Sequence, residues 1–240
     1  MKFAIVFAAI LCLFFSSPVE AKDKVLRIST SYRNLLSNSD CSGMLDQIVT
    51  EAFRRIGIKV EIVFTTTKRS VVEVNDGLLD GELNRIEGME QGFNNLVRVP
   101  EPNMQMHFVA FAKRDIPISD WESLKDLRIG LVSGWKILEQ NIKGFPNVTY
   151  LTEIATLFKM LEMDRLDVVL YSQLTGYEEL HKLGYDDIHH LTPPLCVNDM
   201  FLYLHKSHKE IVVPVAEALR EMKKDGTYDK IIQETTGHLH

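Results

Sequence analysis

The chain has 240 residues, and its 33 Asp or Glu residues outnumber its 27 Lys or Arg residues, which gives a formal net charge of -6 at pH 7. Proteins that bind nucleic acid present an excess of basic residues, so this balance argues against that class and favours small molecules or proteins as partners. The length allows two lobes.

The chain begins with a segment typical of export. Lys2 precedes thirteen consecutive apolar residues, 3–15, and the compact residues Val19 and Ala21 follow at positions that suit a signal peptidase. The apolar run is shorter than the roughly 20 residues that cross a bilayer. We therefore expect residues 1–21 to be a cleaved signal peptide, the mature protein to begin at Lys22, and its compartment to be the periplasm.

Cysteine usage agrees with export. Removal of the leader leaves two cysteines, Cys41 and Cys196. An even number of cysteines in an oxidising compartment is compatible with a disulfide, and two separate buried thiols are the alternative. The sequence leaves this choice open, because a bridge also depends on the distance between the two Cα atoms.

Strands and helices alternate in the first part of the predicted mature chain. Apolar residues recur at helical spacing between residues 44 and 56, with Asp40 or Ser42 as the expected cap and Gly57 as the expected stop. The pattern predicts strands at 25–30, 58–64 and 82–86, and helices at 44–56 and 70–75.

A second alternation follows. It predicts strands at 108–113, 128–132, 148–151 and 166–171, a helix from about residue 135, and another at 154–161. Further predicted elements are a strand at 200–205, a helix opened by Ser207 and Glu210 and ended by Gly226, and a short helix at 228–234. Alternating elements indicate the α/β class with mainly parallel sheets flanked by helices.

Ligands of such sheets lie beyond the carboxyl ends of the strands. The corresponding segments are 31–34, 85–88, 133–136 and 171–173. We therefore expect the binding residues among them.

Several local strings occur in an order that resembles a known family. The strings are Gly77-Leu78-Leu79-Asp80-Gly81, Trp121-Glu122-Ser123-Leu124-Lys125-Asp126-Leu127-Arg128-Ile129-Gly130 followed by Ser133-Gly134, Arg165-Leu166-Asp167-Val168-Val169, and Lys224-Asp225-Gly226-Thr227-Tyr228-Asp229-Lys230-Ile231-Ile232. With the first strand and helix, they make the predicted mature chain similar to the extracellular solute-binding proteins of polar amino acid importers.

The resemblance implies a type II periplasmic-binding-protein fold. Two lobes are then joined by a two-strand hinge that closes on a ligand. The implied boundaries are 22–103 with 201–240 for lobe one, 108–196 for lobe two, and 103–107 with 196–200 for the hinges. The implied role is a monomeric binding protein without catalytic activity or cofactor, which serves an ABC-type permease or a membrane receptor.

The charges that hold an amino acid in this family are missing. The resemblance implies an acidic residue after the first strand, another after the strand that contains Asp167, and an arginine for the ligand carboxylate, but these positions here are Ser31, Ser172 and Gly92. A buried ammonium without a carboxylate partner costs several kcal/mol. We therefore do not expect a plain α-amino acid as ligand.

The remaining candidates suggest an anionic or aromatic ligand. Arg85 ends a predicted strand and suits a carboxylate or phosphate, and Ser133-Gly134-Trp135 opens a helix whose free N–H groups favour an anion. The alternative for Arg85 is a surface ion pair with Glu82 or Glu87.

Aromatic residues also occur among the candidate segments. Tyr32 and Tyr171 suit stacking on a flat ligand, or they are half-exposed aromatics without such a role. Trp135 is equally compatible with ordinary packing between the lobes. Ser31 and Ser172 complete the predicted ligand site.

Other functions remain open. A dehydratase or lyase on the same fold would use Glu87 or Glu82 beside Arg85 as general acid. A sensing module for a peptide or a protein would have a wide site with little closure. The histidines lack the ligand spacing of a closed metal site, so we predict no metal.

Overall fold

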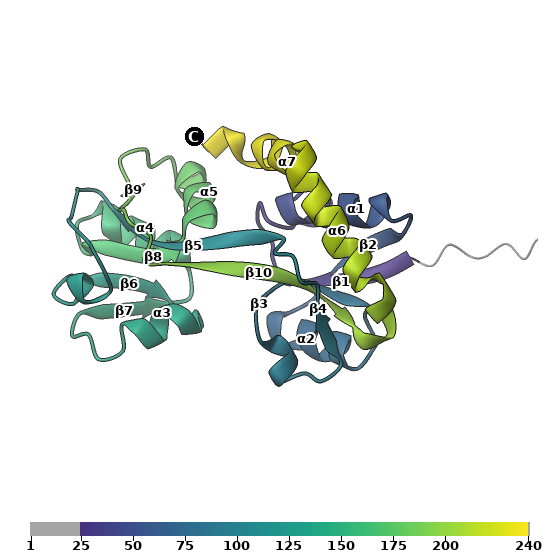
Figure 1. The fold of residues 1–240 in the computed structure, drawn as a ribbon. Coiled ribbons are helices and arrows are strands. Elements are labelled where there is room, and N and C mark those ends of the chain that lie inside the picture. Colours follow the sequence, from purple (N-terminus) through teal and green to yellow (C-terminus); the bar gives the residue numbers. More distant parts are fainter. Residues whose placement is uncertain (1–24, 240) are drawn as a thin grey trace, which may run out of the picture.

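The computed structural model describes residues 25–239 and shows two groups of elements joined by two long strands (Figure 1). The predicted signal peptide lies outside the described residues. In the described part no helix is long and apolar enough to cross a membrane. We call the group that contains β1 lobe one and the group that contains β6 lobe two.

Lobe one contains a short sheet between two helical layers. Its strands are β1 (Val25–Thr30), β2 (Lys59–Phe64), β3 (Gly81–Ile86) and β4 (Leu96–Arg98), and its helices are α1 (Met44–Arg55), α2 (Thr67–Asn75), α6 (Lys209–Asp225) and α7 (Thr227–Thr236). Helices α1, α6 and α7 contact one another on one face, and α2 lies on the other (Figure 1). β1 pairs in parallel with both β2 and β3.

Lobe two repeats this layered arrangement. Its strands are β6 (Ile129–Val132), β7 (Val148–Leu151), β8 (Val168–Ser172) and β9 (His189–His190), and its helices are α3 (Lys136–Asn141), α4 (Ile154–Glu162) and α5 (Gln173–Leu183). β6 pairs in parallel with β7 and β8. The parallel pairs of both lobes bring their carboxyl ends to common edges, where ligands of α/β sheets bind.

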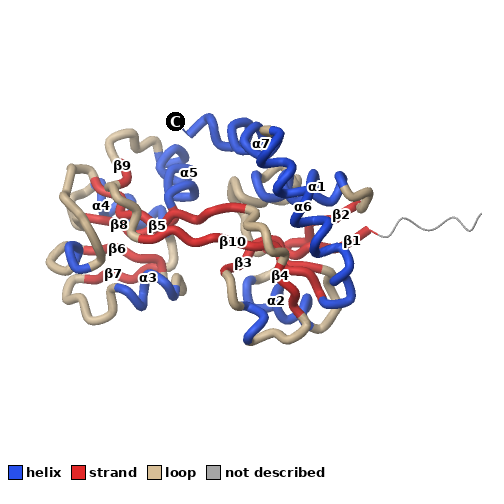
Figure 2. Tube along the Cα trace, viewed as in Figure 1, coloured by secondary structure: helices blue, strands red, loops and turns tan. Residues whose placement is uncertain are grey.

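Two antiparallel strands connect the lobes. β5 (Met104–Ala112) and β10 (Cys196–His205) pair with each other from Cys196 opposite Phe108 to Met200 opposite Met104. The sheet therefore continues from one lobe to the other in the order β2-β1-β3-β10-β5-β8-β6-β7. Figure 2 shows these strands running side by side between the lobes. The predicted crossings 103–107 and 196–200 fall in this paired region, and the exact lobe boundaries stay a prediction.

Helix α1 begins at Met44 as predicted, but its cap is not one of the two expected residues. Its N-cap is Gly43 rather than Asp40 or Ser42. The Asp46 carboxylate accepts hydrogen bonds from the backbone N–H groups of Gly43 and Asn38 at 3.2 and 3.0 Å. A carboxylate inside the first turn thus fulfils the capping role expected of a residue before it. Similarly, α6 has His208 as its N-cap, and Ser207 lies in a preceding 3-10 turn.

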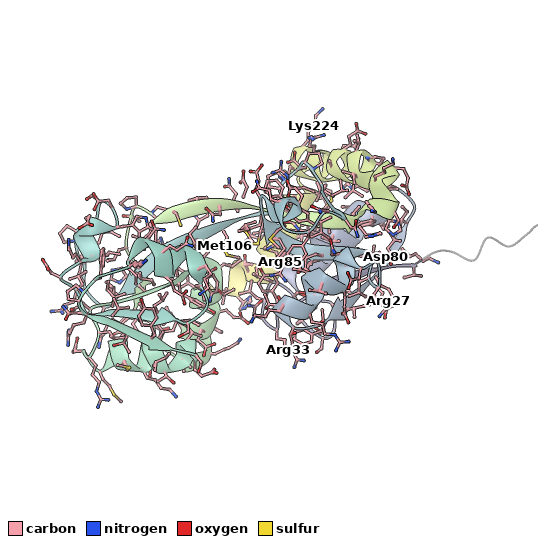
Figure 3. The ribbon with its side chains drawn as sticks, turned by 90° about the horizontal axis from the view of Figure 1, so that it is seen from below. Arg27, Arg33, Asp80, Arg85, Met106 and Lys224 are labelled. Atoms are coloured by element: carbon pink, nitrogen blue, oxygen red, sulfur yellow. The ribbon has the colours of Figure 1, made fainter. Side chains whose placement is uncertain are left out.

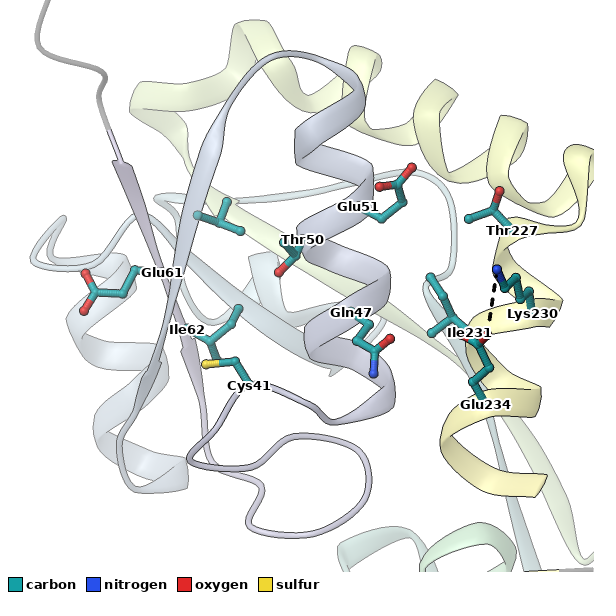
Figure 4. A pocket seen from close by; sticks show the side chains of 11 residues that line it. Cys41, Gln47, Thr50, Glu51, Glu61, Ile62, Thr227, Lys230, Ile231 and Glu234 are labelled. Atoms are coloured by element: carbon teal, nitrogen blue, oxygen red, sulfur yellow. Dashed lines mark ion pairs between the residues drawn. The ribbon is translucent and has the colours of Figure 1, made fainter. Parts of the chain in front are cut away.

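The possible disulfide between Cys41 and Cys196 is absent, and both residues are free thiols. Cys41 lies beside Ile62 of the edge strand β2 (Figure 4), whereas Cys196 begins β10. β1 and β3 lie between β2 and β10 in the sheet. Three inter-strand steps of about 4.8 Å exceed the roughly 4.4–6.8 Å between Cα atoms that a bridge requires.

These positions predict the reactivity of the two thiols in a chain that begins at residue 22. Burial raises the pKa of both thiols, and nearby carboxylates raise that of Cys41 further, so exposure distinguishes them. Cys41 is exposed and should react with iodoacetamide in the folded protein, whereas Cys196 is half-buried and should react more slowly. Mass spectrometry under non-reducing conditions should find both cysteines alkylated after unfolding. If the unfolded chain is alkylated only after a reducing agent is added, the two cysteines form a disulfide and this assignment is wrong.

Candidate functional site

Aromatic side chains gather where β8 ends and α3 begins. The indole of Trp135 lies 5.0 Å from the Tyr171 ring and 5.3 Å from the Phe108 ring, measured between ring centroids. Phe108 comes from β5, Tyr171 from β8 and Trp135 from the turn before α3, so three segments of lobe two build one apolar surface. We call Phe108, Trp135 and Tyr171 the aromatic cluster. Such a surface can stack on a flat ligand.

Tyr32 extends this surface from lobe one. It follows β1, and its hydroxyl accepts a hydrogen bond of 3.3 Å from the side-chain amide of Asn84 on β3. Tyr32 and Trp135 are both partly buried and pack against the hydrophobic core that contains Phe108. Burial raises the pKa of Tyr171. The structure thus brings Trp135 and Tyr171 together, and a shared role with Tyr32 in one site stays a prediction.

Arg85 is already paired inside lobe one. Its guanidinium lies 2.8 Å from a Glu82 carboxylate oxygen, where the Arg85 side chain is 16% and the Glu82 side chain 2% exposed. It also donates to the carbonyl of Thr67 at 3.2 Å. The alternative of an ion pair with Glu82 is the observed one, although the pair is largely buried rather than on the surface. Ligand contact by Arg85 stays a prediction.

Glu82 is the centre of a buried polar network. The hydroxyls of Ser29 and Ser70 donate to its carboxylate, and Arg85 supplies the counter-charge. Burial raises the pKa of Glu82, while Arg85 and Ser29 oppose that effect. Arg85 therefore offsets part of the cost of charging a carboxyl group in an environment that disfavours its charge.

The predicted anion site at the start of α3 is occupied by the protein itself. The backbone N–H of Gly134 donates to the Glu139 carboxylate at 2.7 Å, and the N–H of Ser133 donates to the Leu151 carbonyl at 2.8 Å. Lys136 pairs with the same carboxylate and, with Gly134, lowers the pKa of Glu139. The expectation of free N–H groups is wrong for Ser133 and Gly134, because the Leu151 carbonyl and a carboxylate within α3 accept their hydrogen bonds.

The two predicted serines lie apart from the aromatic cluster. Ser172 follows Tyr171, and successive side chains of a strand point to opposite faces. It lines a separate cavity with Met106 and Leu239. Ser31 is partly exposed beside Tyr32.

The sequence analysis overlooked contributions from β3 and β5. Asn84 is 1% exposed and contacts both Tyr32 and the Met104 sulfur, and Phe108 supports the Trp135 indole. Both residues lie within strands, whereas the predicted binding segments come after strand ends. The alternation of inward-facing positions along β5 is the signal that could have identified Phe108. Within residues 25–239 no cluster of His, Cys, Asp and Glu could hold a metal ion.

Known proteins share this fold at low sequence identity. No protein-family model matches the chain. An uncharacterized protein of Shewanella oneidensis is 25% identical over 198 residues, which are 78% of this chain and 74% of the relative.

Solved structures extend the comparison. The substrate-binding protein of an amino acid ABC transporter is similar at a TM-score of 0.63 and 21% identity, covering 88% of this chain and 98% of that one. A histidine kinase sensor domain with similarity to periplasmic binding proteins gives 0.68 and 14%, covering 90% and 96%. An ancestral amino acid-binding protein, a precursor of cyclohexadienyl dehydratase, gives 0.65 and 18%, covering 88% and 95%. The chain thus has the two-lobed, type II periplasmic-binding-protein fold.

The Glu82 network yields a stability prediction with a defined pH dependence. Arg85→Gln leaves Glu82 buried without a cation, which costs on the order of 3 kcal/mol when the carboxylate is charged. Because the folded-state pKa of Glu82 would rise further, the variant should lose stability as pH increases and approach the wild type at acidic pH.

Urea unfolding between pH 5 and pH 8 measures this effect. Arg69→Gln is the matched control, because Arg69 is 72% exposed and pairs with Glu73 on the surface of α2, where a pair contributes less than about 1 kcal/mol. Equal losses in the two variants, or an Arg85→Gln defect that does not grow with pH, would show that the buried pair lacks this role.

Proposed function

We propose that the chain is an exported, periplasmic solute-binding protein whose lobes close on a small ligand that carries an aromatic ring. The observation that carries this proposal is the aromatic cluster in lobe two, with Tyr32 of lobe one packed against the core that contains Phe108. A ring held between the two lobes would favour the closed form by contacting both of them. An ABC-type permease or a membrane receptor would then recognise that form.

The hinge supports closure of this kind. In the described part of the chain only β5 and β10 run through both lobes, and they pair with each other over Met104–Phe108 and Cys196–Met200. A ladder of two strands can twist without breaking the sheets on either side, so small changes along it become a large rotation of one lobe. We place the lobe boundaries at 103–107 and 196–200 for this reason.

A dehydratase or lyase is the second candidate. A carboxyl group whose pKa burial raises is suited to general acid catalysis, and Glu82 is such a group. However, Glu82 is 1% exposed and hydrogen-bonded by Ser29 and Ser70. Glu87 is paired with Arg98. Both carboxylates thus have structural partners, which favours binding without turnover.

The proposal predicts that Trp135 contributes to ligand affinity. Calorimetric titration of the wild type should detect one site for phenylacetate or indole-3-acetate. Trp135→Ala should weaken binding of both about tenfold, since one aromatic pair contributes about 0.5–1.5 kcal/mol beyond its buried area. Binding should also raise the thermal midpoint of the wild type by mass action.

Tyr150→Ala is the control, because Tyr150 is an aromatic of lobe two that is 47% exposed on β7. Its affinity should equal that of the wild type. Chromatography of each ligand after prolonged incubation tests for turnover. Conversion of the ligand, or unchanged affinity of a folded Trp135→Ala variant, would refute the proposed binding role.

A further inference from the structure

Arg33 presents a guanidinium that pairs with no carboxylate of residues 25–239. It is exposed in the loop after β1, and its Cζ atom lies 3.7 Å from the centroid of the Phe64 ring. Among residues 25–239 it has neither an ion pair nor a hydrogen-bond acceptor. Stacking fixes the plane of a guanidinium while leaving its N–H edges available, and those edges fit a carboxylate through two parallel hydrogen bonds.

A cavity of about 370 Å³ adjoins this guanidinium. It is lined by residues that follow β1 or belong to the ends of β1 and β2: Thr30, Tyr32, Arg33, Asn38, Ser39, Ile62 and Phe64. Thr30 and Phe64 are paired at the carboxyl ends of these parallel strands, the edge at which α/β sheets bind ligands. Its volume falls in the range typical of small-molecule sites, about 300–1,000 Å³.

The lining has a charge suited to a monoanion. Arg33 is its single cationic residue, and no Asp or Glu lines the cavity. Thr30, Tyr32 and Ser39 add hydroxyls, and Asn38 adds an amide. One guanidinium balances one carboxylate, whereas a phosphate dianion would retain an unbalanced charge.

The other expected anion-binding groups are occupied. Glu82 pairs with the Arg85 guanidinium, and the Glu139 carboxylate accepts a hydrogen bond from the Gly134 N–H. Figure 3 shows Arg33 and Arg85 on the part of lobe one nearer to lobe two, with Arg27 farther away. Tyr32 lines the Arg33 cavity and packs against the same hydrophobic core, which contains Phe108, as Trp135 of the aromatic cluster does.

We propose that the cavity beside Arg33 is a carboxylate subsite and that the ligand is an aromatic carboxylic acid. This inference rests on the proposed function, since it takes the ligand ring to lie against Tyr32 and the aromatic cluster. Arg33 then holds the ligand carboxylate, and Arg85 serves the structural network of Glu82. Arg33 is thereby the residue that selects acids over neutral aromatic compounds of the same shape.

Pairs of acids and their amides test this selection. Calorimetry compares phenylacetate with phenylacetamide and indole-3-acetate with indole-3-acetamide. The wild type should prefer each acid at least about tenfold, the effect of a charge-assisted bidentate contact. Arg33→Gln should abolish that preference by weakening acid binding while leaving amide binding unchanged.

Arg27→Gln is the matched control. Arg27 is also an exposed arginine of lobe one, but it lines a different cavity with Arg69 and Glu73. The substitution removes the same charge, so it reports any contribution of the long-range field. Acid preference that survives Arg33→Gln, or that Arg27→Gln reduces equally, would overturn the subsite while leaving aromatic binding intact.

A second measurement separates failure of the subsite from failure of the proposed function. If neither acids nor amides bind the wild type, the aromatic ligand is refuted, and acetate then probes the carboxylate subsite alone. A saturable shift of the Arg33 Nε–H signal in ¹⁵N NMR spectra, absent for Arg27, would support the subsite. Absence of a saturable shift would overturn it.

Discussion

The antiparallel ladder between β5 and β10 is the constraint on which the rest of the structure depends. It joins the two lobes into one hydrogen-bonded sheet, and it also positions the candidate site. Phe108 at one end of the ladder supports Trp135, and Met104 at the other end contacts Asn84, which binds the Tyr32 hydroxyl. Rotation about this ladder would therefore move the aromatic residues of lobe two relative to Tyr32. Closure and ligand contact are linked because the same two strands provide both.

Ion pairs and hydrogen bonds within the protein determine which charged and polar groups remain for a ligand. Glu82 forms an ion pair with Arg85 within lobe one. Within lobe two, the Glu139 carboxylate accepts a hydrogen bond from the Gly134 N–H and forms an ion pair with Lys136. Each arrangement satisfies a polar group that would otherwise be costly to leave without a partner. The groups left are aromatic surfaces and the stacked guanidinium of Arg33. Under the proposed function, this division is how a site without the charges of an amino acid binder would select an acid.

Much of the fold could be predicted from the sequence, because the spacing of apolar residues and the positions of cap and turn residues were clear. The strands 25–30 and 148–151 and the end of α6 at Gly226 appear where the pattern placed them. Helix α5 was missed, since Gly176 in its middle weakens the helical signal. The glycine is required there because a Cβ atom would overlap the Phe111 ring, a contact across lobe two. Burial and long-range placement were invisible. The sequence offered Glu82 as one possible partner of Arg85 but not that the pair is buried, and nothing local separates Cys41 from Cys196 by two strands.

The central claim is that an aromatic ligand draws the lobes together about β5 and β10. Small-angle X-ray scattering of the wild type, titrated with indole-3-acetate, tests it most directly. The account predicts that the radius of gyration falls with the saturation curve of the ligand and stays constant for Trp135→Ala at the same concentrations. Stoichiometric binding with an unchanged radius of gyration would contradict it, because the ligand would then occupy a single lobe without closing the hinge.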